Sequence, residues 1–92
     1  MSNGNLEKVK NAYFSGKADE RYLKTQICFY ADAIRGCNSE KDRKVEATVL
    51  KDFIENLIEQ NIRPISAEMK VELEEIVVVV ELCTTTGKLK HF

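Results

Sequence analysis

The chain has 92 residues, of which 14 are basic and 15 acidic, so its formal net charge is -1, and 43% of its residues are hydrophobic. A fold of this size hides only about 60–65% of the surface that the unfolded chain exposes, which excludes a second independent core. The near-neutral charge excludes a general attraction to nucleic acid or anionic lipid, so any such binding requires a local patch.

The first two segments have the apolar spacing of amphipathic helices. In the first, apolar residues recur at three- and four-residue steps, at Leu6, Val9, Tyr13 and Phe14. Gly16 then ends the pattern, because glycine readily takes the left-handed conformation found at helix ends. The second segment places its apolar residues on one face, at Leu23, Ile27, Tyr30, Ala31 and Ile34. Asp19 before it and Gly36 after it are typical of helix boundaries.

A third helix is predicted to begin after Ser39. This serine is followed by Asp42 at the third position, where an acidic residue interacts favourably with the unpaired amides of the first turn. The following apolar residues come in adjacent pairs at helical spacing and form a wide stripe, which includes Val49, Leu50, Phe53, Ile54, Leu57 and Ile58. Pro64 ends the pattern, because a proline disfavours helical geometry at the residue before it.

The fourth segment carries two conflicting signals. Ser66 resembles an N-cap, and a helical face continues through Met69, Leu73, Val77 and Val80. The run 76–80, however, consists of five β-branched residues, which favour a strand. We predict a helix, and therefore an all-α fold, a small bundle of about four helices. The alternative is an α+β fold in which 76–82 and 88–92 form a short hairpin. In either case we expect a single domain over 1–92, with 1–4 and 88–92 frayed.

The β-branched run has a consequence that holds for both structures. On a helix its side chains point all round the axis, and on a strand they cover both faces, so no side of the segment is suited to water. Three other short helices do not readily enclose it, and we therefore expect the chain to self-associate as a homo-oligomer. The residues predicted to form the oligomer interface are Met69, Leu73, Ile76, Val77, Val78, Val79 and Val80.

The sequence offers little chemistry for catalysis. Its single histidine, His91, lies one residue from the last, where it is poorly placed to act as a general base. The three cysteines match none of the close-paired spacings of zinc sites and are interpreted as free thiols, at Cys28, Cys37 and Cys83. We therefore expect a protein that is not an enzyme and has no catalytic residues, metal or cofactor.

Two groups of residues are candidates for partner binding. Glu68, Glu72 and Glu75 share one stripe of the fourth helix, which we call the acidic stripe and which suits a basic partner surface. The residues before position 39 carry a net charge of +2 and most of the aromatic rings, a combination that can bind nucleic acid or a nucleotide. Tyr22 and Phe29 lie off the main apolar stripe of their helix and are the best candidates for exposed contacts.

These features predict a small protein-binding module that modulates a protein partner, of the accessory or inhibitor type. The alternative is a nucleotide- or nucleic-acid-binding regulator that uses the basic, aromatic first half. The first ten residues lack the apolar core of a secretory signal, and the longest apolar run, 76–80, is far shorter than the ~20 residues that cross a bilayer. We therefore expect a cytoplasmic protein with no membrane partner.

Overall fold

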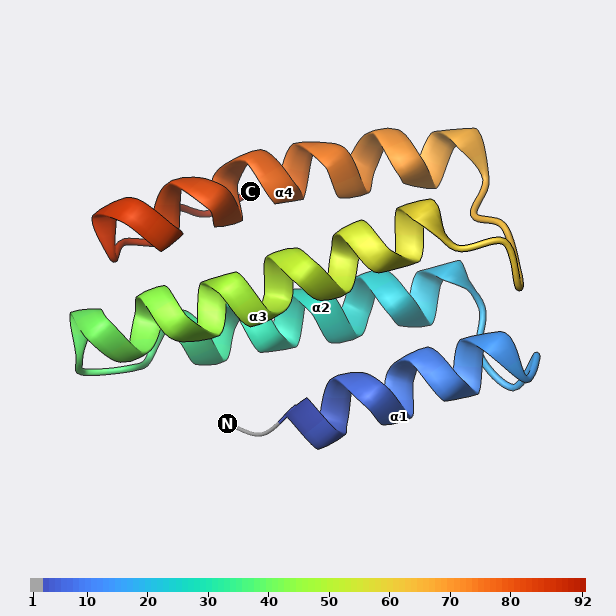
Figure 1. Ribbon diagram of the computed structural model, residues 1–92, viewed down its shortest axis with the longest axis horizontal. Helices are drawn as coiled ribbons and strands as arrows, with labels where there is room; N and C mark the ends of the chain where they lie inside the picture. Colours follow the sequence, from blue (N-terminus) through green and yellow to red (C-terminus); the bar gives the residue numbers. More distant parts are fainter. Residues whose placement is uncertain (1–2) are drawn as a thin grey trace.

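The computed structural model describes residues 3–92 and forms an up-and-down helical bundle over that range (Figure 1). Its elements are four helices, α1 (Asn3–Phe14), α2 (Glu20–Arg35), α3 (Glu40–Glu59) and α4 (Ala67–Thr86). No strand forms within residues 3–92. The predicted all-α class is confirmed.

Side-chain caps begin three of the helices at the residues that the sequence indicated. Asp19 Oδ1 accepts a hydrogen bond from the Tyr22 amide at 2.9 Å. Ser39 Oγ accepts one from the Asp42 amide at 3.3 Å, and Ser66 Oγ accepts one from the amide three residues later at the same distance. Each cap satisfies an amide that has no partner within its helix, which explains why these helices begin where they do.

The helical assignment of the fourth segment is confirmed, and the alternative hairpin of 76–82 with 88–92 is not formed. The cap at Ser66 starts α4, and Gly87 ends it in the left-handed conformation, with φ 73°. Between them the helical period places the buried residues on one face, at Met69, Leu73, Ile76, Val80 and Cys83. Burial of this face outweighs the strand preference of the β-branched run, because tertiary packing dominates intrinsic propensity.

The helices are arranged around α3, which packs against each of the other three. In Figure 1, α4 lies along one edge of the molecule and α1 along the opposite edge, with α2 and α3 between them. The resulting body is flattened, with principal extents of 36 × 24 × 17 Å. Because α4 sits at an edge and packs most closely on α3, a large part of its circumference is left uncovered.

Arginines fix the segments that follow the helices. Arg63 Nη1 donates to the carbonyl oxygens of Tyr13 at 2.7 Å and Ala18 at 2.6 Å, and its guanidinium lies 4.3 Å from the centre of the Tyr13 ring. Arg43 Nε donates to the Gly87 carbonyl oxygen at 2.5 Å. These charge-assisted bonds join segments that lie more than forty residues apart in the sequence.

The ends of the chain were expected to fray. Residues 1–2 lie outside the part that the structure describes, and α1 begins directly after them. At the other end, Leu89 is buried, and Arg35 Nη2 donates to the Lys90 carbonyl oxygen at 2.7 Å. The Arg35 guanidinium also lies 5.0 Å from the centre of the Phe92 ring, so the segment after α4 runs back along α2.

Candidate functional site

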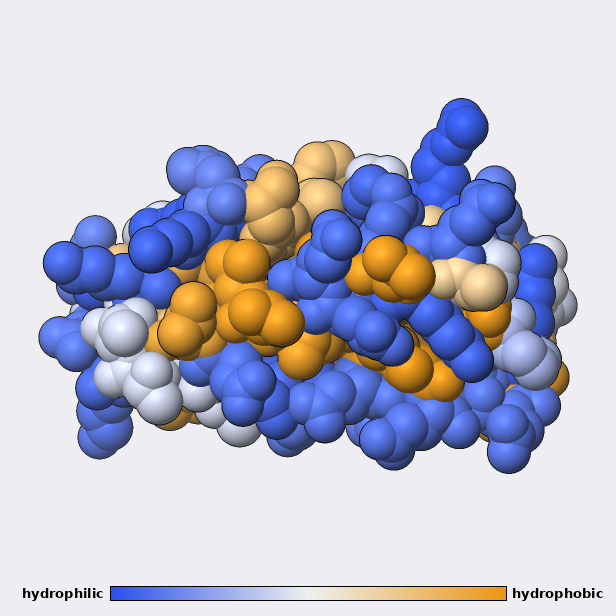
Figure 2. Space-filling view, turned by 90° about the horizontal axis from the view of Figure 1, so that it is seen from above, coloured by the Kyte–Doolittle hydropathy of each residue, from blue (hydrophilic) through white to orange (hydrophobic). Residues whose placement is uncertain are grey.

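The outer face of α4 carries an exposed row of large apolar side chains. Val71, Val78 and Leu82 are 56%, 59% and 50% exposed, respectively, and we call them the outer row. They follow one another at seven- and four-residue steps, so they lie along the same side of the helix, opposite its buried face. Figure 2, which looks onto the molecule from the α4 side, shows hydrophobic surface in two groups with hydrophilic side chains between and around them.

The residues predicted as an oligomer interface are divided between the two faces of α4. Four of them belong to the core of this chain itself, Met69, Leu73, Ile76 and Val80. Val77 and Val79 are half-buried at the sides of the helix, and Val78 points outward. The surface that a second chain could reach is therefore narrower than the predicted set and includes two residues that the prediction omitted, Val71 and Leu82.

Glutamates border the outer row on both sides. The acidic stripe of Glu68, Glu72 and Glu75 follows the side of α4 that faces α2, where Lys24 Nζ of α2 lies 3.0 Å from Glu72 Oε1. Helical spacing places the remaining glutamates of α4, Glu74 and Glu81, on the opposite side of the row. All five carboxylates are exposed, and α4 contains a single lysine. The outer row is thus an apolar strip inside a negatively charged surface.

The two aromatic residues predicted for partner binding lie apart from this surface. Tyr22 and Phe29 of α2 are 40% and 62% exposed. Phe29 lines a small groove together with Leu6 and Val9 of α1, on the side of α2 opposite to the Lys24 ion pair. The structure therefore does not bring the acidic stripe and the exposed aromatic rings into one site.

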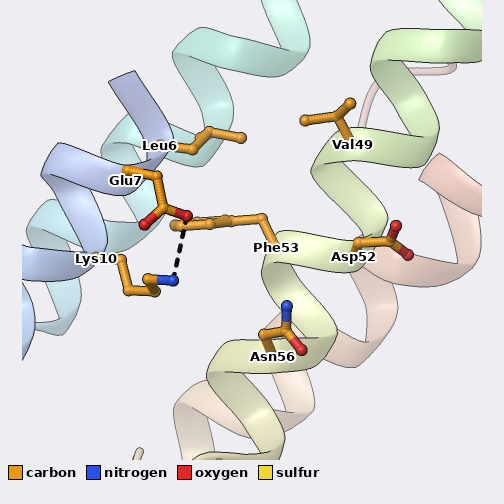
Figure 3. Close-up of a pocket in the computed structure, with 7 residues that line it drawn as sticks. All are labelled: Leu6, Glu7, Lys10, Val49, Asp52, Phe53 and Asn56. Carbon is orange, nitrogen blue, oxygen red and sulfur yellow. Dashed lines mark hydrogen bonds and ion pairs between the residues drawn. The ribbon is translucent and has the colours of Figure 1, made fainter. Parts of the chain in front are cut away.

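A second groove lies between α1 and α3, with a volume of about 200 Å³. Figure 3 shows the Phe53 ring extending from α3 toward α1, with Leu6 and Val49 beside it. The Glu7 carboxylate accepts a hydrogen bond at 3.2 Å from Lys10 Nζ, one turn further along α1, and this ion pair lies at the rim of the groove. This groove can accommodate a small apolar group, and its acidic lining residues are Glu7 and Asp52.

Two titratable side chains in the interior, Tyr30 and Cys83, have raised pKa values. Burial and the hydrogen bond that its hydroxyl donates to Glu46 raise the pKa of Tyr30 above its ordinary value. Burial also raises the pKa of the Cys83 thiol, which leaves this cysteine protonated and a poor nucleophile at neutral pH. Within residues 3–92, no three side chains of the metal-binding types converge on one point.

Comparison with known proteins gives no assignment: no family model, no curated protein and no solved structure matches the chain. Among helices α1–α4, none is both long enough and apolar enough to cross a membrane. The exposed apolar side chains on the outer face of α4 are the feature on which the leading functional proposal rests.

Proposed function

We propose that this chain is a small non-catalytic protein-binding module that docks on a protein partner through the outer face of α4 and modulates that partner. The observation that carries the proposal is the outer row, in which three large apolar side chains are each at least half exposed along one line. Exposed apolar side chains gathered on one face and bordered by polar residues are typical of protein interaction sites.

The energetics of the outer row suit a reversible contact. Covering a half-exposed valine or leucine side chain contributes about 1 kcal/mol, so the row supplies a few kcal/mol toward docking. The half-buried Val77 and Val79 add to the surface that a partner can cover. Because association costs several kcal/mol in lost freedom of motion, docking also requires contacts beyond the row.

The protein partner can also be a second copy of this chain, which then associates with itself through the same row. Two copies paired along α4 bury the outer row against itself, but they also bring the glutamates of one copy close to those of the other. We therefore expect self-association to be weak at low ionic strength and to strengthen as added salt screens this repulsion. Sedimentation equilibrium at several protein and salt concentrations measures both effects.

The docking surface can be tested by site-specific photocrosslinking in the cells that make the protein. A photoreactive amino acid at position 78 is compared with the same residue at position 45, because Val45 of α3 is 52% exposed and thus about equally accessible. We expect adducts from position 78 and few from position 45, and we expect Leu82→Asp to abolish them. Equal crosslinking from both positions contradicts the proposal.

The second candidate function is binding of a nucleotide or nucleic acid by the first half. The exposure of Phe29 favours it, because a free aromatic face can stack on a base. Ion pairs with Glu7, Glu72 and Asp32 occupy three of the six basic residues before position 39, which reduces the positive charge available for phosphate. Binding of this kind weakens steeply with salt, and Phe29→Ala tests it directly.

A further inference from the structure

We infer that the occupant of the outer face of α4 is a lysine- or arginine-rich amphipathic helix; this inference rests on the proposed function and names its partner. The reasons lie in the length of the outer row, in the position of its glutamates and in the partners that these charges disfavour.

The outer row has the dimensions of a helix–helix contact. From position 71 to position 82 it extends about 16 Å along the axis, which corresponds to three turns. Its spacing of seven and then four residues is the repeat with which two helices match side chains along a shared seam. A helix laid along α4 can therefore cover Val71, Val78 and Leu82 together.

Two glutamates lie within this contact area. The turn between Val71 and Val78 is occupied by Glu74 and Glu75, both exposed, on either side of the row. A helix that covers both valines has to pass over these carboxylates and remove part of their water. Desolvation of a carboxylate is costly unless a cation or hydrogen-bond donor replaces the lost water. The partner must therefore carry donors beside its apolar residues, level with the middle of the row.

The chain itself does not supply those donors. On the α2 side, Lys24 pairs with Glu72. On the α3 side, Lys51 Nζ lies 2.6 Å from Glu55 Oε1. Among the ion pairs formed within residues 3–92, none includes Glu74 or Glu75, and Lys70 is the single basic residue of α4. The central carboxylates therefore remain available for cations from outside.

The same charges select against other occupants. Nucleic acid and anionic lipid are repelled by a surface that carries five glutamates. A second copy of the chain brings the same glutamates and meets like charge with like charge. A neutral apolar helix desolvates Glu74 and Glu75 without compensation. An amphipathic helix with lysine or arginine beside its apolar residues covers the outer row and also supplies cations to the carboxylates.

The test uses two fluorescently labelled peptides of about three heptads each, with leucines on one face. One peptide carries lysines at the remaining positions and the other carries glutamates. We expect the full chain to bind the lysine peptide in fluorescence anisotropy, with an affinity that falls as salt is added, and to bind the glutamate peptide at least about tenfold more weakly.

Matched variants assign the binding to the surface. The double variant Glu74→Gln/Glu75→Gln removes the central charges, and Asp52→Asn/Glu59→Gln removes two charges from the exposed side of α3. We expect the first pair to weaken binding of the lysine peptide about tenfold and the second pair to change it less than about twofold. Because all four side chains are exposed, circular dichroism should show an unchanged fold in both.

The outcomes separate the inference from the proposed function. Equal binding of the two peptides, equal effects of the two double variants, or no binding of the lysine peptide overturns the inference of a basic partner. If Leu82→Asp still abolishes the position-78 crosslinks, the docking surface stands with a different occupant, and an adduct of twice the chain mass identifies that occupant as a second copy. If Leu82→Asp leaves both peptide binding and the position-78 crosslinks unchanged, the proposed function itself is contradicted.

Discussion

The two longest helices, α3 and α4, are both 20 residues long but are used differently by the fold. α3 packs against the other three helices, and its exposed side is mainly polar, with residues such as Lys41, Thr48 and Asp52. α4 is covered mainly on one side and exposes the outer row on the other. Apart from Val45, the large apolar side chains of α3 are at least partly covered within the domain, whereas three of those on α4 are at least half exposed.

This difference shows what an apolar pattern specifies. It indicates how much surface of a segment is unsuited to water, but it leaves open whether the same chain or another one provides the cover. In α3 the pattern and the packing agree. In α4 they agree on the inner face alone, and the disagreement on the outer face is the basis of the functional proposal.

The largest expected effect comes from comparing two leucines of α4. Leu73 is fully buried, and Leu82 is 50% exposed. We expect Leu73→Ala to lower the free energy of unfolding by about 2–5 kcal/mol, because it leaves a cavity in the core, and Leu82→Ala to lower it by less than about 0.5–1 kcal/mol. Urea unfolding of both variants measures this. Similar losses would show that the outer face of α4 is covered in the native protein.

The end of α4 provides the next comparison. Gly87 and Gly16 both have positive φ, but a Cβ at position 87 would overlap with the Glu40 side chain at the start of α3, whereas space is open at position 16. We expect Gly16→Ala to cost about 1 kcal/mol and Gly87→Ala about 1–3 kcal/mol. In thermal unfolding, Glu40→Ala should recover part of the second loss. No recovery would mean that conformational strain alone accounts for it.

The third prediction concerns the packing of α2 on α3, where the Tyr30 hydroxyl donates a hydrogen bond to Glu46. Its contribution to stability depends on pH. Below pH 10, the ordinary pKa of tyrosine, the side chain is protonated in both the folded and the unfolded state. Above it, the unfolded tyrosine ionises while the raised pKa keeps the folded one neutral. We expect stability to fall by up to about 1.4 kcal/mol per pH unit from this group. Tyr30→Phe should flatten the slope in urea unfolding between pH 9 and 11; an unchanged slope contradicts this.

Much of the fold could be predicted from the sequence because its determinants are local. Asp19, Ser39 and Ser66 cap helices within three residues of themselves, and Gly16 and Gly87 end them through their own backbone geometry. The period of apolar residues then identifies each buried face. These signals act over one or two turns, so they can be read without knowing how the helices pack.

The remainder depends on contacts between distant segments. Arg63 bonds to carbonyl oxygens near the end of α1, some 45–50 residues away, and nothing in its neighbourhood indicates this. The exposure of Val71 and Leu82 follows from the position of α4 at the edge of the bundle, which the pattern does not specify. The sequence did contain one signal for them: both lie in line with Val78 and opposite the buried face.

The smallest expected effect is a change in the free energy of unfolding whose sign, positive or negative, is informative. Val78 and Val80 lie two residues apart on α4, the first 59% exposed and the second fully buried. We expect Val80→Ala to lower the free energy of unfolding by about 1–3 kcal/mol, because two buried methyl groups are lost. We expect Val78→Ala to raise it by a few tenths of a kcal/mol, up to about 0.6, because alanine is the better helix former at a position without packing.

The effect of Val78→Ala on stability should be measured at several protein concentrations. In a monomer the stabilisation by Val78→Ala is the same at every concentration, since no second molecule contributes to the packing of the side chain. If copies pair through the outer row, the variant loses stability relative to the natural chain as concentration rises, and the sign reverses. Thermal unfolding over a hundredfold range of concentration therefore measures whether the outer face of α4 is bare in solution, the condition on which docking of a basic helix depends.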